Sequence, residues 1–579
     1  VTISSGGSVD LTLEADTLDI EANGEVTINE TDDVTVNRLE QNSTDSNLTL
    51  TAGGSVVYND NIEATNDAVI SMNVGTLTLN NSIESENGAI SLIASSGMSF
   101  SAQGDIKNTA GNVSLNSGSG ILEMNAETVF NSGTGILSLT SGSDMTIGKL
   151  QSQFSDNGGS QAAIVVNSGG YVYDSEDSTI DIVAVNETVE INAANGIGGG
   201  EFEAIETNVK ELILTNSTTG DILISELDDI EISEISQDGS GVITLETVDG
   251  SITVQNDGIS STSGDITLYA GGNDTTNFFT LNADINTTGG SVSITTEQGD
   301  VTLKEDIFVN GLGDILIAAN NGAILNDITT LDWEMENDPA NDNYDFNKDL
   351  VWVFKNFKFD IDKNTGEIVV ANATPYEEQQ YFANGTVLKG IAGAYIQTTE
   401  GKITLEAKEN IGGRSIDDPF VGIETQEEQA KRELLEKIAL TVLVDAEKLT
   451  MYSANRDEIF VTAMDSVEVV KSEKAGSKAG ATNVTTLAYD AEQTITDAVD
   501  ASGEDIEIIS SDINIDESVR SAGGVLNIST INPYANIAIG DYITDPVLLE
   551  ALQLDKSEIA NLENGFEEII IGSETSANK

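Results

Sequence analysis

The chain has 579 residues, with 98 acidic residues against 24 basic ones and a net charge of −74. Nucleic acids and anionic lipids are bound through clustered Lys and Arg, and the first 300 residues hold only Arg38, Lys107, Lys149 and Lys210, so this composition argues against both partners. Because the chain lacks cysteine and histidine, it has no disulfides, no thiolate sites and no imidazole base.

The N-terminus reads as the middle of a repeat. It starts Val1-Thr2-Ile3 without an initiator Met or a signal peptide, so we expect a processed product or an excerpt of a longer polypeptide. The chain also has no run of about 18 apolar residues, and a membrane-spanning helix is therefore not expected.

A five-residue pattern, Gly-x-[Ile/Leu/Val]-x-[Leu/Ile], recurs along the chain. Its copies begin at Gly88, Gly111, Gly135, Gly241, Gly264, Gly290, Gly313 and Gly401. Most neighbouring copies within the two runs are 23 or 24 residues apart. We expect each glycine to turn a corner, often with positive φ, and the alternation after it to bury one face of a short strand. All five prolines follow residue 338, and proline is excluded from central strands.

This period predicts the fold class: an all-β chain forming a right-handed parallel β-helix, or β-solenoid, of about 20 coils. We expect coils over 1–330, a small inserted β-subdomain over 331–395, and a continuing β-helix over 396–579. Short helical insertions are expected near 425–440 and 545–564.

The segment 331–395 differs from the coils in composition. It contains 11 of the chain's 29 aromatic residues, including both tryptophans, Trp333 and Trp352. Two interpretations stay open: the aromatics form the core of the insert, or the tryptophans form an exposed ligand platform, for example for a glycan.

Two later segments have helical signatures. Thr425 to Glu428 forms a capping box before apolar residues at helical spacing. Near the C-terminus, Asp545 is placed to cap a helix that starts at Pro546, and Asn564-Gly565 is a plausible end for a second helix.

One motif inside the insert suggests a metal. Asp360, Asp362 and Asn364 have the 1, 3, 5 spacing of calcium ligands, although Gly366 stands one place late for an EF-hand. The alternative is a hairpin turn with a glycine bulge between two alternating runs. Calcium is the only cofactor that the sequence suggests.

Three stretches resemble the filamentous-haemagglutinin-like giant surface proteins of bacteria. Their characteristic turns are Asn195-Gly-Ile-Gly198, Glu409-Asn-Ile-Gly412 and Leu562-Glu-Asn-Gly565, each followed by the strands of a new coil. The resemblance covers nearly the whole chain apart from 331–395. It implies a right-handed parallel β-helix exported to the cell surface or medium, and it carries over no catalytic residues.

Together these features predict a non-enzymatic extracellular rod, part of a bacterial surface adhesin or secreted exoprotein, that presents its insertions to cell-surface or matrix glycans or proteins. A structural subunit of an extracellular fibre, sheath or surface layer, which binds other copies of itself, is the alternative. A polysaccharide-degrading β-helix enzyme is a third hypothesis, which the scarcity of basic residues disfavours.

Overall fold

The computed structural model describes two compact units, residues 1–272 and 273–579. Within them the described residues are 1–64, 66–155, 161–175, 179–199, 204–326, 395–409, 411–412, 442–453, 459–463, 467–469, 483–486, 492–496, 498–500, 505–510, 512–530, 537–540 and 552–572, together with the backbone of five short strands between 334 and 389.

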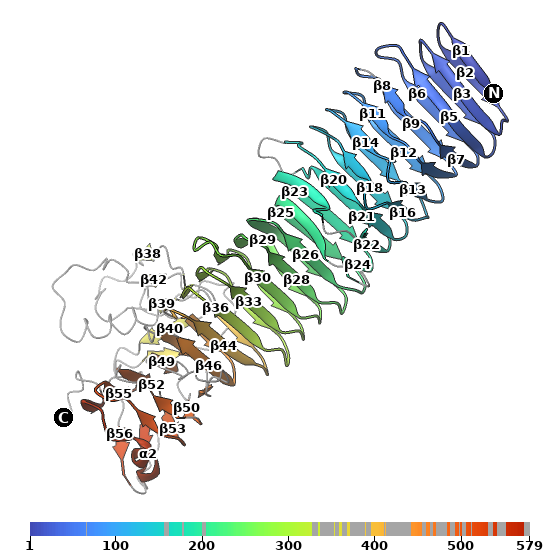
Figure 1. The fold of residues 1–579 in the computed structure, drawn as a ribbon. Helices are drawn as coiled ribbons and strands as arrows, with labels where there is room; N and C mark the ends of the chain where they lie inside the picture. The colour runs from blue at the N-terminus through green and yellow to red at the C-terminus, as the bar shows by residue number, and fades with distance from the viewer. Residues whose placement is uncertain are drawn as a thin grey trace, which may run out of the picture. The chain divides into compact units, whose positions relative to one another are not determined.

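Parallel strands make up nearly all of the described structure and form a β-solenoid, which confirms the predicted fold class. The strands of the first unit are stacked as successive rungs, drawn from blue to green in Figure 1. They are β1 (Thr2–Ser5), β2 (Val9–Leu13), β3 (Thr17–Ala22), β4 (Val26–Glu30), β5 (Val34–Gln41), β6 (Leu48–Ala52), β7 (Ser55–Tyr58), β8 (Ile62–Ala64), β9 (Ile70–Val74), β10 (Thr76–Leu79), β11 (Ile83–Ser85), β12 (Ile90–Ala94), β13 (Met98–Phe100), β14 (Ile106–Asn108), β15 (Val113–Asn116), β16 (Leu122–Met124), β17 (Val129–Asn131), β18 (Leu137–Ser141), β19 (Met145–Ile147), β20 (Lys149–Gln151), β21 (Ile164–Ser168), β22 (Tyr171–Asp174), β23 (Ile182–Ala193), β24 (Gly196–Ile197), β25 (Ile205–Asn216), β26 (Ile222–Glu226), β27 (Ile230–Gln237), β28 (Ile243–Thr247), β29 (Ile252–Ser261) and β30 (Ile266–Ala270).

The described residues of the second unit contain the remaining strands and one helix. They are β31 (Phe279–Leu281), β32 (Ile285–Thr287), β33 (Val292–Thr296), β34 (Val301–Leu303), β35 (Ile307–Val309), β36 (Ile315–Ala319), β37 (Ile324–Asn326), β38 (Glu334–Met335), β39 (Trp352–Val353), β40 (Lys358–Ile361), β41 (Ile368–Val370), β42 (Leu388–Lys389), β43 (Tyr395–Thr398), β44 (Lys402–Ala407), β45 (Val442–Asp445), β46 (Lys448–Ser453), β47 (Phe460–Ala463), β48 (Val467–Val469), β49 (Asn483–Thr486), β50 (Glu492–Ile495), β51 (Val499–Asp500), β52 (Ile506–Ile509), β53 (Asp512–Ile515), β54 (Val519–Arg520), β55 (Val525–Ser529), β56 (Ile537–Ile539), β57 (Leu552–Leu554), α2 (Lys556–Asn561) and β58 (Glu568–Ile571).

The repeated motif forms the core because its apolar positions stack in register. Ile90 pairs with Val113, which pairs in turn with Leu137, each one turn further along. All three side chains are fully buried. Each turn therefore covers the apolar face of its neighbours, and no single turn has to bury that face alone.

The motif glycines serve a different purpose from the one expected. None of the eight has a positive φ, so the predicted backbone conformation is wrong. A Cβ on Gly264 would instead overlap the carbonyl oxygen of Gly241, and one on Gly111 would overlap that of Asn87. Glycine is needed at these corners because successive turns approach too closely for a side chain.

Aspartates at several corners accept hydrogen bonds from the backbone of the next turn. The Asp221 carboxylate accepts a hydrogen bond from the backbone N–H of Val242 at 2.9 Å, and the Asp314 carboxylate accepts one from Lys402 at 2.8 Å. Such charge-assisted bonds are stronger than neutral ones. They explain why Gly-Asp-Ile recurs, and they give part of the acidic composition a structural role.

The register of the second unit reveals where residues have been added. Val292 pairs with Ile315, 23 residues on, but Ile315 pairs with Ile403, 88 residues on. About 65 residues are therefore inserted between two consecutive turns. Ile403 pairs with Leu449, 46 residues on, which corresponds to a second, shorter insertion.

The first insertion contains a separate small sheet with the strand order β38-β42-β39-β40-β41. The predicted bounds of the insert, 331–395, stay a prediction. The helix expected near 425–440, with its capping box, lies outside the described residues.

Helix α2 lies near the C-terminus, inside the range predicted for helical structure. Asp555 caps it, and Asp555 and Glu558 form a reciprocal capping box. The helix ends at Asn561 because Leu562 is extended and packs against the neighbouring core, so the predicted stop at Asn564-Gly565 is wrong by three residues. Asp545 and Pro546 lie outside the described residues. No helix in the described parts of the chain is long and apolar enough to span a membrane.

Candidate functional site

Two of the residues that the sequence singled out, Trp352 and Asp360, lie in strands of the small inserted sheet. Asp360 lies in β40, and Asp362 and Asn364 are outside the described residues. Strand β40 runs antiparallel to β41, with Asp360 opposite Val369, so the strands of the hairpin alternative are confirmed. The calcium alternative stays a prediction. Trp352 lies in β39, of which only the backbone is described, and Trp333 lies outside the described residues.

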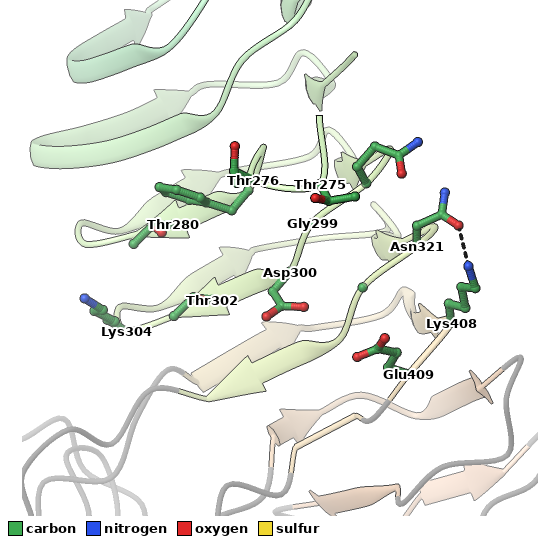
Figure 2. A pocket seen from close by; sticks show the side chains of 13 residues that line it. Thr275, Thr276, Thr280, Gly299, Asp300, Thr302, Lys304, Asn321, Lys408 and Glu409 are labelled. Atoms are coloured by element: carbon green, nitrogen blue, oxygen red, sulfur yellow. Dashed lines mark hydrogen bonds between the residues drawn. The ribbon is translucent and has the colours of Figure 1, made fainter. Parts of the chain in front are cut away.

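An open groove in the second unit is a stronger candidate. Its volume is about 660 Å³, within the range typical of ligand-binding sites. The groove crosses four consecutive turns of the solenoid (Figure 2). Its lining residues are Thr275, Thr276, Phe278, Thr280, Gln298, Gly299, Asp300, Thr302, Lys304, Asn321, Gly322, Lys408 and Glu409.

Strand register positions the middle of the groove. Thr280 of β31 pairs with Thr302 of β34, and both side chains point outward because the residues on either side of each are buried. Neighbouring parallel strands are about 4.8 Å apart, so the two threonines present hydroxyl groups at that interval. A hydroxyl both donates and accepts hydrogen bonds.

Hydrogen bonds fix three of the polar side chains that line the groove. Lys408 donates to Asn321 Oδ1 at 2.8 Å, shown as the dashed line in Figure 2, and Asn321 donates to the carbonyl oxygen of Glu297 at 2.7 Å. Asp300 accepts a hydrogen bond from the backbone N–H of Ala323 at 2.8 Å. These contacts hold an amide, an ammonium and a carboxylate on a rigid wall.

The lining of the groove is locally neutral and has one apolar surface. In Figure 2, Lys304 and Lys408 stand on opposite sides, with Asp300 and Glu409 between them. Phe278, also in the lining, is 43% exposed. The lining of the groove is therefore neutral, although the chain as a whole has a net charge of −74.

A group of buried carboxylates in the first unit is the second candidate. Oxygens of Asp174, Asp181 and Glu206 all lie within 4.8 Å of one another, and Asp174 and Asp181 are almost completely buried. Burial, followed by the charge of Asp174, raises the pKa of Asp181 well above its usual range. A proton on Asp181 therefore relieves the repulsion in this group.

Glu226 is a further buried acid in the same unit. Burial raises its pKa to about 7, against hydrogen bonds that favour the charged form, including one from the Thr207 hydroxyl at 2.6 Å. This carboxylate changes charge near neutral pH, although nothing in its sequence surroundings distinguishes it from the other acids.

Sequence reasoning missed both sites. The groove brings together residues from 275 to 409, and the last turn follows the 65-residue insertion, so spacing along the chain does not reveal it. A faint signal existed for the carboxylates, because Asp181 and Glu206 are separated by about one turn. With 98 acids in the chain, such coincidences are frequent.

In comparisons with known proteins, no family model matches this chain, and no curated protein and no solved structure matches it significantly. The fold therefore defines the class, a parallel β-solenoid repeat protein, and the likeness to haemagglutinin-like adhesins rests on the turn motifs alone.

Proposed function

We propose that this chain is a non-enzymatic extracellular scaffold of a bacterial surface adhesin, which presents its inserted segments to cell-surface or matrix glycans or proteins. The observation that most directly supports this proposal is the pairing of Ile315 with Ile403 across about 65 inserted residues. A solenoid whose turns remain in register on both sides of such an insertion can hold the inserted segment at a fixed position.

The chemistry of the chain agrees with a binding scaffold. Several corner aspartates accept hydrogen bonds from the next turn, and Asp181 and Glu226 are buried. An acidic surface keeps a large protein soluble and disfavours association with polyanions. Without histidine, the chain lacks the residue that most often acts as general base near neutral pH.

Removing the insertion tests the adhesive role. Deleting 65 residues, 328–392, brings Ile315 and Ile403 to the 23-residue spacing of a regular turn. We expect this variant to keep the far-UV circular dichroism and thermal unfolding of the full chain, and to lose binding to wells coated with mucin, fibronectin or collagen. A control that replaces 328–392 with a Gly/Ser linker of equal length should lose binding as well. Full binding by both variants would contradict the proposal.

The non-enzymatic part of the proposal has its own test. The purified chain should release no reducing ends and no unsaturated products from pectate, alginate or xylan. Measurable turnover of any of them would favour the polysaccharide-degrading alternative.

The fibre alternative depends on contacts between copies. Ile559 and Leu562, in and after α2, pack against the core of the last described turns and cover part of it. Electron microscopy of the purified chain should show separate particles, whereas regular polymers would favour a fibre or surface-layer subunit.

A further inference from the structure

We propose that the groove lined by Thr280, Thr302 and Phe278 binds a neutral, extended, β-linked oligosaccharide lying along the stacking direction of the turns. This site goes beyond the adhesion proposal, because every lining residue lies outside the segment 328–392 that the adhesion test removes.

The charge of the lining selects a neutral ligand. Two lysines and two carboxylates line the groove, so it offers no net attraction to an anion or a cation. The net charge of −74 repels polyanions from the rest of the chain, and a cationic ligand would find acidic groups almost anywhere on the surface. A neutral ligand is the class that this groove can distinguish.

The side chains in the lining suit a polyhydroxylated ligand. The hydroxyls of Thr275, Thr280 and Thr302 and the amide of Gln298 can each donate and accept hydrogen bonds, as sugar hydroxyls require. Thr276 already donates to Asp274, and Asn321 is held by Lys408 and Glu297. The half-exposed ring of Phe278 offers an apolar surface against which the C–H face of a pyranose can pack. A purely apolar ligand would leave these polar groups without hydrogen bonds, at a cost in affinity.

The spacing of the turns indicates the shape of the ligand. Thr280 and Thr302 are one turn apart, about 4.8 Å, which is close to the length that one sugar unit adds to an extended β-linked chain. The four turns that form the groove span about 14 Å, enough for about three sugar units. A coiled α-linked chain would not match this repeat.

Lys408 and Asn321 close the groove at its far turn. Their hydrogen bond of 2.8 Å joins two turns that are separated in sequence by the insertion. The far end of the groove therefore forms because the solenoid resumes in register after the inserted residues.

Isothermal titration calorimetry of the full chain with cellohexaose tests the proposal, with maltohexaose and hexagalacturonate as the α-linked and anionic comparisons. We expect saturable binding of cellohexaose and at least tenfold weaker binding of the other two. Phe278→Ala and the double variant Thr280→Val with Thr302→Val should each weaken cellohexaose binding at least tenfold. Unchanged thermal unfolding will show that these surface variants are folded.

Matched controls replace similar side chains outside the groove: Leu312→Ala, which alters another exposed apolar residue, and Thr295→Val, which alters an outward threonine of β33. Both should bind like the unmodified chain. No cellohexaose binding, or equal binding by the Phe278 variant and its control, would overturn the groove proposal, as would tighter binding of hexagalacturonate. Because the deletion of 328–392 leaves every lining residue in place, loss of adhesion with intact cellohexaose binding would support the groove as a separate site.

Discussion

The two units share one stacking scheme but use their polar residues differently. Four of the 24 basic residues lie in the first unit and the other 20 lie in the second. The first unit contains the group of Asp174, Asp181 and Glu206 and the buried Glu226, whereas the second contains a long insertion and a groove with lysines in its lining. Both units therefore use the same corner glycines and the same hydrogen bonds to corner aspartates. They nevertheless differ in the polar side chains that they bury or expose.

The glycine corners should be the most sensitive part of both units. Gly264→Ala in the first unit and Gly313→Ala in the second place a Cβ against the carbonyl oxygen of the preceding turn. We expect each to lower the free energy of unfolding by about 3 kcal/mol or more in urea denaturation followed by circular dichroism. Gly7→Ala and Gly289→Ala, where nothing lies within 4 Å, are the controls. A large effect in only one unit would show that the two units do not depend equally on their corner glycines.

The buried acids should make the first unit sensitive to pH. The pKa of Glu226 is raised from 4.5 to about 7, so the folded state keeps a proton that the unfolded state loses. This stabilisation is complete below pH 4.5 and is lost as the pH rises towards 7, by about 3 kcal/mol. Glu226→Gln should remove that part of the pH dependence, measured by urea denaturation at pH 4.5 and at pH 8. An identical pH dependence in the variant and the unmodified chain would show that Glu226 is not buried in a protonated form.

Substituting the corner aspartates should lower the free energy of unfolding less than substituting the corner glycines, and by the same amount in the two units. Asp221→Ala and Asp314→Ala each remove one charge-assisted hydrogen bond to the next turn and should cost about 2 kcal/mol by urea denaturation. Asp221→Asn, which keeps an acceptor, should recover part of the loss. Asp238→Ala removes an exposed acid of the first unit and serves as the charge control. If Asp238→Ala destabilises the protein as much as Asp221→Ala, the hydrogen bond that Asp221 accepts from the next turn does not stabilise the fold.

Exposed ion pairs should contribute least. Lys107 lies 3.3 Å from Glu84 and 3.4 Å from Asp105, and its side chain is half exposed. Lys107→Met should change the free energy of unfolding by less than about 1 kcal/mol, and the difference should shrink in 0.5 M NaCl. A loss as large as that of the aspartate variants would mean that scarce basic residues stabilise the first unit more than exposed pairs usually do.

The fold could be predicted from the sequence because a solenoid repeats its local rule in every turn. Ile90, Val113 and Leu137 share one motif position, and the structure stacks them directly. The role of the glycines could not be predicted, since close approach between turns depends on the neighbouring turn and not on the local sequence. The groove could not be predicted either, because Lys408 and Asn321 form a hydrogen bond across neighbouring turns but are separated in the sequence by the inserted residues.

Cross-linking across the insertion tests the central claim most directly, namely that the solenoid resumes in register after about 65 inserted residues. The chain has no cysteine, and Leu316 pairs with Thr404 in neighbouring parallel strands. In the double variant Leu316→Cys with Thr404→Cys, mild oxidation should form a disulfide nearly completely, as seen by mass spectrometry of the digested protein. The offset pair Leu316→Cys with Glu406→Cys should remain largely reduced. A disulfide in the offset pair, or none in the first, would contradict the register on which the account depends.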